Sequence, residues 1–423
     1  MTEGLRSDPP GDAAMNRVRV VIALALTYAL LGILMNSVGV VILQSIRHFD
    51  ATKPMGSTLE ACKDLSVVAA SFLLATRVPA FGYRRALIAV MTLIGGACLL
   101  ASFATGFVAM QGLFVATGLS FGIAKVATYS SIGLLARDPA DHASITGLVE
   151  GVFMIGLLVG VWLFGWFVGA DTTGSEWLHV YWVLGGACLA LALLWIVTPL
   201  DERDAVAPDE AEAAHWGEML RLAALPASVA VLAGLFLYVL VEQSVGTWLP
   251  TFNNEVLHLP AAMSVQMTSI FVGALAVGRL ASGVVLRRIA WLPALLGCLG
   301  CIAVLIVVSL PLASGVTPRP DTGWFDAPAA AYLFPLLGVF LAPIYPTLCS
   351  VALSALPRHR HAAMMGLIVI FSALGGTLGS FITGLLFQRL PGALAFYFTL
   401  VPIALIAIAL PVIRKRQSQA AAA

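Results

Sequence analysis

Long apolar stretches separated by short polar ones account for most of the chain. A bilayer core of about 30 Å requires about 20 apolar residues per helix, and twelve stretches meet that requirement. Their approximate ranges are 18–44, 58–78, 86–105, 107–135, 144–169, 178–199, 222–249, 264–286, 291–313, 328–356, 361–387 and 393–413. This pattern predicts an all-α integral membrane protein with twelve transmembrane helices, because a helix satisfies all of its backbone hydrogen bonds internally.

Lysine and arginine residues are distributed unequally between the two sides of these spans. The richer side holds Arg6, Arg17, Arg19, Arg77, Arg84, Arg85, Arg137, Arg203, Arg221, Arg287, Arg288, Arg358, Arg360, Arg414, Lys415 and Arg416, whereas the other holds Arg47, Lys53, Arg319 and Arg389. Cytoplasmic loops retain positive charge, so the richer side is predicted to be cytoplasmic. With an even number of spans, both termini are expected in the cytoplasm of a bacterial-type inner (plasma) membrane.

An acidic connector divides the chain into two halves. We expect a cytoplasmic tail over 1–17, a six-helix bundle over 18–200, the connector over 201–220, a second six-helix bundle over 221–413 and a cytoplasmic tail over 414–423. Each half carries an arginine pair between its second and third spans, Arg84-Arg85 and Arg287-Arg288. Matched features of this kind suggest two pseudo-symmetric bundles with a substrate site between them at the bilayer midplane.

Composition excludes several classes of function. The chain is 60% hydrophobic, 11% charged and has a formal net charge of +1, so nucleic acid is not an expected partner. It contains no GxxxxGK[ST] motif and no cluster of metal-ligand residues, which argues against an ATP-driven pump, an enzyme or a resident cofactor. The expected partners are a small-molecule substrate and the lipid bilayer, and the expected state is a monomer driven by an ion or substrate gradient.

Several ionisable residues fall inside the predicted spans. Lys125, Asp64 and Glu150 lie roughly 18, 20 and 14 Å along their helices from the nearest cytoplasmic charge, and therefore at a similar depth. Because a charge in a span is costly, we predict that these three form a network lining a cavity in the first half, opposed by Glu242 and Gln243 in the second. The alternative is a static ion pair that only positions helices.

Polar and aromatic residues near these charges have two possible roles. Asn36, Tyr129, Trp248 and Tyr345 occur at a comparable depth and could bind a polar solute through amides and amphipathic rings, but membrane helices also use such residues to join one another. Lys63 is adjacent to Asp64 and points about 100° away from it, so an outward, snorkelling orientation is expected. Glu60 is expected at an interface between helices.

The paired arginines belong to longer motifs. The run Gly278-Arg279-Leu280-Ala281-Ser282-Gly283-Val284-Val285-Leu286-Arg287-Arg288 resembles the GRxxxGxxxxR signature at the end of helix eight of the major facilitator superfamily, and Gly82-Tyr83-Arg84-Arg85 resembles the remnant of its first-half counterpart. The resemblance implies conformational gating by Gly82, Arg84, Arg85, Gly278, Arg279, Gly283 and Arg288. Arg84, Arg85 and Arg279 would then stabilise the outward-facing state through cytoplasmic contacts between helices.

Further stretches resemble the fucose:proton symporter and TsgA-like branch of this superfamily. The run 238–248 is similar to YxGxExxxGxW in helix seven, and 344–347 with 366–379 resembles helices ten and eleven. The branch implies proton-coupled sugar uptake by alternating access. Its helix-one aspartate has no counterpart at 36–39, its helix-four glutamate corresponds to Lys125, and its helix-five glutamine corresponds to Glu150.

These departures leave three mechanisms open. The proton site could have moved to Glu150 or Asp64 with Lys125 as counter-charge, an anionic substrate could bind Lys125, or transport could proceed without a proton. We expect a secondary transporter of a sugar or sugar acid with the proton as coupling ion. The alternatives are a proton-driven exporter of amphipathic drugs and a non-transporting receptor or scaffold.

Overall fold

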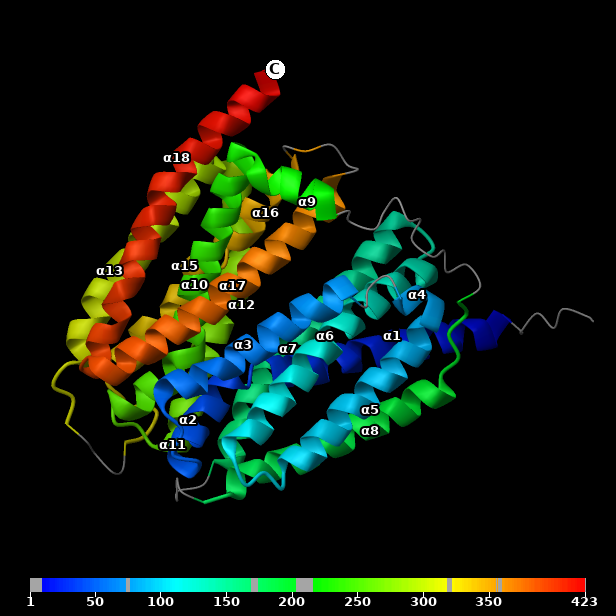
Figure 1. Cartoon of the computed structure of the whole chain (residues 1–423), viewed down its shortest axis with the longest axis horizontal. Helices are drawn as coiled ribbons and strands as arrows, with labels where there is room; N and C mark the ends of the chain where they lie inside the picture. The colour runs from blue at the N-terminus through cyan, green and yellow to red at the C-terminus, as the bar shows by residue number, and fades with distance from the viewer. Residues whose placement is uncertain are drawn as a thin grey trace, which may run out of the picture.

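The computed structural model describes residues 10–73, 77–168, 174–202, 216–317, 322–354, 356 and 360–422. The first half comprises α1 (Pro10–Met35), α2 (Val38–His48), α3 (Lys53–Leu73), α4 (Val78–Phe81), α5 (Tyr83–Ala101), α6 (Phe107–Leu135), α7 (Pro139–Phe167), η1 (Glu176–His179) and α8 (Val180–Val197) (Figure 1). The second comprises α9 (Trp216–Ala224), α10 (Pro226–Glu255), α11 (Ala261–Gln266), α12 (Thr268–Arg288), α13 (Trp291–Ala313), α14 (Ala330–Leu333), η2 (Phe334–Leu336), α15 (Leu337–Leu341), α16 (Ile344–Ser354), α17 (His361–Arg389), η4 (Gly392–Thr399) and α18 (Leu400–Ala422).

The all-α membrane fold predicted from the sequence is confirmed. Within the described ranges, 11 helical segments are long and apolar enough to cross a membrane. The twelfth span is α3, which carries Glu60, Lys63 and Asp64 and is therefore too charged to qualify by composition. Its 21 residues cover roughly 31 Å, enough to cross the hydrocarbon core.

Some boundaries differ from the predicted ones. Helix α1 begins at Pro10 rather than at residue 18, and α18 continues to Ala422 through the predicted 414–423 tail, because charged residues without a helix breaker can extend a helix beyond the bilayer. Most of the predicted connector, residues 203–215, lies outside the described residues. The first span is interrupted between α1 and α2, and the tenth between α15 and α16.

Helix pairing repeats between the halves. In the first half α1 packs on α7, α3 on α6, and α5 on α8, and in the second half α10 packs on α17, α12 on α15, and α13 on α18. These pairs join the first and fifth, second and fourth, and third and sixth spans of each half. The repeated arrangement supports the prediction of two related bundles.

Glycine positions repeat as well. A Cβ atom on Gly156 of α7 would lie 2.4 Å from the carbonyl oxygen of Ala29, and one on Gly379 of α17 would lie 2.3 Å from that of Leu240. Both glycines belong to the fifth span of their half, and both face the first span. The two glycines therefore allow the first and fifth spans of each half to pack closely.

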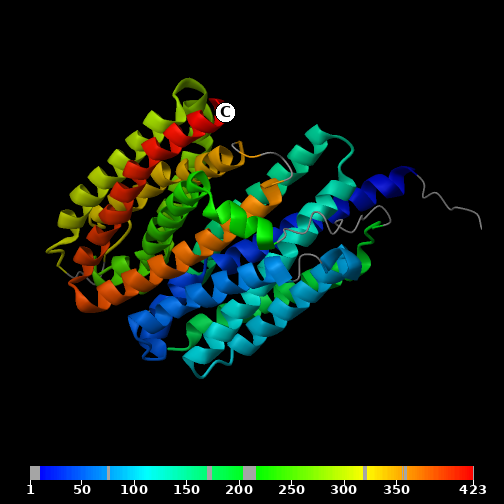
Figure 2. The ribbon, with the colours of Figure 1, turned by 45° about the horizontal axis from the view of Figure 1, so that its top comes forward.

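The two halves make close contacts at the end opposite the termini. Lys53 Nζ forms an ion pair with Glu255 at 2.6 Å, and Arg47 hydrogen-bonds to Asn254. Helices α3 and α17 run side by side in both views, while the ribbons of the two halves spread apart toward the end that carries the termini (Figures 1 and 2). These contacts close this conformation at the end opposite the termini.

Candidate functional site

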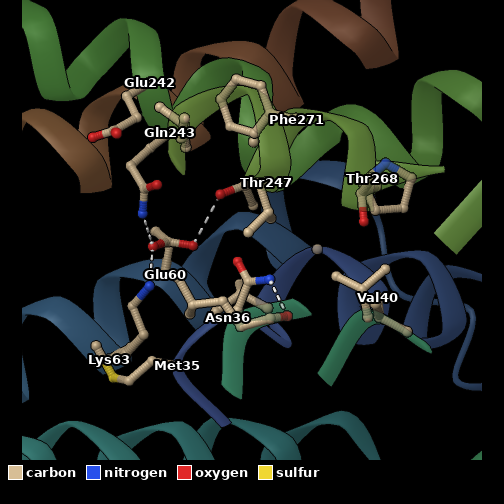
Figure 3. A pocket seen from close by; sticks show the side chains of 18 of the residues that line it. Met35, Asn36, Val40, Glu60, Lys63, Glu242, Gln243, Thr247, Thr268 and Phe271 are labelled. Carbon is tan, nitrogen blue, oxygen red and sulfur yellow. Dashed lines mark hydrogen bonds and ion pairs between the residues drawn. The ribbon is translucent and has the colours of Figure 1, made fainter. Parts of the chain in front are cut away.

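A cavity of about 200 Å³ lies between the two halves (Figure 3). Apolar residues from the first, fifth, seventh and eighth spans form much of its wall. Its polar and charged lining comes from both halves and consists of Asn36, Glu60, Lys63, Glu242, Gln243, Thr247, Thr268 and Arg279. The cavity thus lies where a solute could contact both bundles at once.

The interruption of the first span brings Asn36 to this cavity. The Asn36 side chain donates to the carbonyl oxygen of Leu157 at 3.4 Å, and Ser37 Oγ donates to that of Leu34 at 2.7 Å. These bonds satisfy polar groups at the end of α1, where the helix loses its regular partners. The amide oxygen of Asn36 remains as an acceptor for a solute, in agreement with the predicted location of this residue.

Glu60 is the polar centre of the contact between the halves. Its buried carboxylate accepts hydrogen bonds from Lys63 on its own helix and from Gln243 on α10, and Thr247 Oγ1 donates to it at 3.1 Å (Figure 3). Three donors compensate the loss of water around a buried carboxylate. Because two of them belong to the second half, this carboxylate connects the bundles, as expected for an interface residue.

The expectation that Lys63 snorkels outward is wrong. The side chain is buried, forms an ion pair with Glu60 and lies 3.6 Å from Asp64. Helix α6 covers this turn of α3 so closely that a Cβ atom on Gly118 would lie 2.2 Å from the Lys63 carbonyl oxygen. Asp64 faces the second half, where its Oδ2 lies 2.7 Å from the position of a Cβ atom on Gly376.

The predicted network of Lys125, Asp64 and Glu150 is not formed. Lys125 is exposed and has no ion pair within the part of the chain that the structure describes. Glu150 accepts a hydrogen bond from Tyr129, and Asp64 contacts Lys63 instead. The three residues lie at a similar depth in the membrane, but their side chains point in different directions around the helix axes and do not meet.

Lys125 nevertheless lies on the inner side of α6. Phe121 and Tyr129, one turn before and after it, pack against Tyr28 of α1 with ring centroids 6.3 and 6.2 Å apart. Residues four apart share a helix face, so Lys125 is on the face that Tyr129 and Glu150 occupy. Glu150 accepts a hydrogen bond from Tyr129 there and forms no ion pair with Lys125.

Glu242 and Arg279 form the second charged group of the cavity. Tyr238 donates to Glu242 Oε1 at 2.9 Å, and the ring of Tyr345 packs on that of Tyr238 with centroids 5.8 Å apart. The guanidinium of Arg279 acts electrostatically on Glu242, and its Nη1 donates to Met154 Sδ at 3.4 Å. Tyr345 therefore supports the site indirectly, since it does not line the cavity itself.

Trp248 does not reach the cavity. Its buried indole Nε1 donates to the carbonyl oxygen of Ser380 at 2.9 Å, and its ring stacks near Phe387 with centroids 5.9 Å apart. This side chain joins α10 to α17. The position is five residues from Gln243, which rotates it about 140° away around the helix.

The residues predicted for gating occupy different environments. Gly82 has φ +95°, and the backbone N–H of Arg84 donates to Glu202 while its Nε donates to the carbonyl oxygen of Trp195. Arg84 therefore binds the end of α8 within its own half. Gly278 packs against α15, and Arg85, Gly283 and Arg288 are exposed. Gating by these residues stays a prediction.

Arg279 is placed differently from the other members of this set. It lines the cavity and lies nine residues before Arg288, the last residue of α12, which corresponds to about 13 Å along the helix. The signature motif associated it with the helix end. Its position instead makes it available to a solute.

Comparisons with known proteins agree with this architecture. The family model described as Major Facilitator Superfamily matches residues 24–334. The nucleoside transporter NupG has a TM-score of 0.71 at 13% identity, covering 95% of this chain and 99% of its own. A bacterial homologue of the human lysosomal transporter Spinster, inward-facing and occupied, has a TM-score of 0.67 at 15% identity, with 96% and 97% covered. FucP in the outward conformation has a TM-score of 0.61 at 14% identity, with 94% and 99% covered. The search of curated proteins found no match.

Proposed function

This chain belongs to the major facilitator superfamily and is a membrane transporter, and we propose that it is a secondary transporter of a small polar solute of the sugar or sugar-acid class. The observation that carries the proposal is the cavity of about 200 Å³ lined by polar groups of both halves. Solved proteins of this fold include a nucleoside transporter and a fucose:proton symporter, which supports a polar solute of similar size.

The dimensions of the cavity favour this class over amphipathic drugs. Sites for drug-sized ligands usually have about 300–1,000 Å³ and a mainly apolar lining. The cavity here measures about 200 Å³ and presents two carboxylates, an ammonium, a guanidinium and two amides. Hydroxyl and carboxylate groups of a small solute would find partners in it.

Alternating access requires the closed end to open. The contacts that hold it include Lys53 with Glu255 and Arg47 with Asn254, all of which join one half to the other. Glu60 would lose Gln243 and Thr247 when α3 and α10 separate, but it would keep Lys63. Because that ion pair lies within one helix, the buried carboxylate stays compensated while the halves rock.

Proton coupling is supported by the charges near the cavity. Three acids, Glu60, Asp64 and Glu242, accompany two bases, Lys63 and Arg279. One acid is therefore in excess, and a proton can be taken up or released without a counter-ion. We further propose a monomer in a bacterial-type inner membrane, with both termini in the cytoplasm and no cofactor, on the basis of the Lys and Arg distribution and the absence of cofactor motifs in the sequence.

Uptake into proteoliposomes tests this function. The panel consists of neutral monosaccharides, uronates, small monocarboxylates and lipophilic cations, each with and without an imposed pH gradient. Accumulation of a sugar or uronate that responds to the gradient is expected. Efflux of lipophilic cations alone would favour the drug exporter, and the lack of flux of any solute would favour the receptor or scaffold.

A matched pair of variants connects the flux to the cavity. Gly246 lines the cavity beside Phe271, so Gly246→Leu should fill it and abolish uptake. Gly273 on α12 has no atom within 4 Å of an added Cβ, so Gly273→Leu should retain uptake. Equal uptake by the two variants would contradict the assignment of this cavity.

A further inference from the structure

Arg279 is the cavity's cation without an ion-pair partner. A guanidinium offers five N–H donors, and Arg279 Nη1 donates to the weak acceptor Met154 Sδ at 3.4 Å. Within the described residues, no carboxylate oxygen lies within 4.0 Å of it. Lys63, the other cation lining the cavity, is already neutralised by Glu60 and Asp64.

Arg279 is an exposed residue that lines the cavity, and a guanidinium within a transmembrane helix gains stability from an anionic partner. Cations in spans usually face a cavity and pair with an acid. The charge of Glu242 interacts with that of Arg279. Tyr238 donates a hydrogen bond to the Glu242 carboxylate and holds it in place. The two groups line the same cavity and form no ion pair with each other, so a solute bound in the cavity can contact both.

We propose, on the basis of the transport function above, that the solute carries a carboxylate which the Arg279 guanidinium binds, and that Glu242 takes up one proton when this happens. The solute class is a small polyhydroxylated carboxylate, a sugar acid. Arginine suits this role because its planar fork matches a carboxylate in a two-bond arrangement. Asn36, Gln243 and Thr268 line the same cavity and can bond the hydroxyl groups.

Charge balance provides the coupling. When the solute carboxylate occupies Arg279, that cation faces two carboxylates, and like charges close together disfavour having both ionised. A proton from the aqueous phase added to a Glu242 oxygen restores neutrality, and it leaves again when the solute dissociates. One proton therefore accompanies one solute anion, so that each transport event moves no net charge.

The surroundings of Glu242 are consistent with a group that gains and loses a proton. Tyr238 of its own helix, Arg279 of α12 and Tyr345 of α16 are the titratable groups whose charges act on it. The charged groups of α3 that line the same cavity are Glu60 and Lys63, and they are engaged with each other. Arg279 is thus the neighbour whose charge a solute can take over.

The test compares uptake of glucuronate and galacturonate with that of glucose and galactose, in wild-type protein and in Arg279→Gln, Arg279→Lys and Glu242→Gln variants. Wild-type protein should transport the uronates at least ten times faster than the neutral sugars. Arg279→Gln should lose uronate uptake and binding by more than tenfold, and Arg279→Lys should recover part of it, because an ammonium keeps the charge but not the fork. Arg287→Gln, an exposed position in the last turn of the same helix, is the matched control and should behave as wild type.

The Glu242→Gln variant tests the coupling separately. It should still exchange labelled for unlabelled uronate across the membrane, but it should no longer accumulate uronate in response to a pH gradient. A cooperative thermal unfolding transition in detergent shows that each purified variant is folded. If Arg279→Gln does not fold, Arg279→Lys is compared with wild-type protein in its place.

The outcomes distinguish this inference from the transport function. Flux of neutral sugars equal to that of uronates, or uronate flux unaffected by Arg279→Gln, would overturn the inference and leave the transporter intact. Gradient-driven accumulation retained in Glu242→Gln would overturn the coupling step. No flux of any solute by the wild-type protein would remove the transport function and the inference together.

Discussion

Lys63 is the central cation of the charged cluster on α3. Its ammonium is buried between Glu60 and Asp64 on the same helix, so the cluster holds two acids and one base. Removing one member of a buried ion pair leaves an uncompensated charge, and this lowers stability more than replacing both members by apolar residues.

We expect Lys63→Met to destabilise the protein by about 3–5 kcal/mol, because the buried Glu60 carboxylate and the half-buried Asp64 carboxylate then lose their cation. The double variant Lys63→Met/Glu60→Gln removes one negative charge as well and should recover a large part of this loss. Unfolding of the purified variants in detergent, compared in a double-mutant cycle, measures both. A double variant no more stable than Lys63→Met would contradict the ion-pair interpretation.

For Lys125 we expect a substitution to have little effect on stability. It is exposed and lacks an ion pair among the described residues, so Lys125→Ala should change stability by less than about 0.5 kcal/mol. Its charge should raise the local concentration of an anionic solute, so the variant's uronate uptake should weaken by a few fold while its uptake of neutral sugars is unaffected. A large loss of stability would mean that Lys125 has a structural partner.

Asp141 supplies a pH reference outside the bilayer. The backbone N–H of Arg137 and the guanidinium of Arg17 hold the pKa of this carboxyl below its ordinary range. A carboxyl with a lowered pKa stabilises the folded protein above its unfolded pKa of about 3.9, and that contribution is lost only as the pH falls toward the folded value. The Arg17–Asp141 pair should therefore give constant stability between pH 5.5 and 8. An Asp141→Asn variant should be less stable by the same amount across this range, and a difference that changes within it would contradict the assignment.

The sequence predicted some site residues and missed others for geometric reasons. Asn36, Glu242 and Gln243 lie on the cavity as expected, because their depth and polarity are readable from the chain. The environment of Lys125 was not predicted correctly, because the depth of a residue in the membrane does not tell in which direction its side chain points. Glu60 could have been recognised, because it precedes Lys63 by three residues and such residues meet on a helix surface.

At the scale of helices, backbone contacts through glycine hold each bundle together. Gly156 of α7 would place a Cβ atom 2.4 Å from the Ala29 carbonyl oxygen, whereas Gly151 of the same helix has no atom within 4 Å of that position. The two glycines belong to one helix and have similar helix propensities. They differ in what an added side chain would meet.

Gly156→Val should therefore separate α7 from α1 and lower the thermal unfolding midpoint by several degrees. Gly151→Val, which adds the same side chain where nothing is close, should leave the midpoint nearly unchanged. Purified variants in the same detergent provide the comparison. If both midpoints fell equally, helix propensity rather than packing would explain the loss.

Hydropathy identified the helices but not their interruptions. Twelve apolar runs predicted twelve spans, and they include α3, although Glu60, Lys63 and Asp64 make it the most charged of them. The break beside Pro343 is marked by a residue that cannot continue helical hydrogen bonding. The break at Asn36-Ser37 has no such marker, since a tertiary hydrogen bond from Asn36 to Leu157 and a local one from Ser37 to Leu34 stabilise it.

For the whole molecule, the central claim is that the two halves rock about the cavity and open at one end at a time. The structure shows contacts such as Lys53–Glu255 at the end opposite the termini. Removing that ion pair should shift the population toward a state open there, since a two-state equilibrium responds to a loss of contacts made in only one state.

The most direct measurement is of two distances by pulsed electron paramagnetic resonance, in the wild-type background and in Lys53→Ala/Glu255→Ala. One label pair joins the exposed positions Met55 and Leu394 at the end opposite the termini, and the other joins Phe81 and Ile289 at the end with the termini. If the halves rock about the cavity, the variant lengthens the first distance and shortens the second in the same fraction of molecules. Distances that stay unchanged, or that lengthen together at both ends, would contradict it.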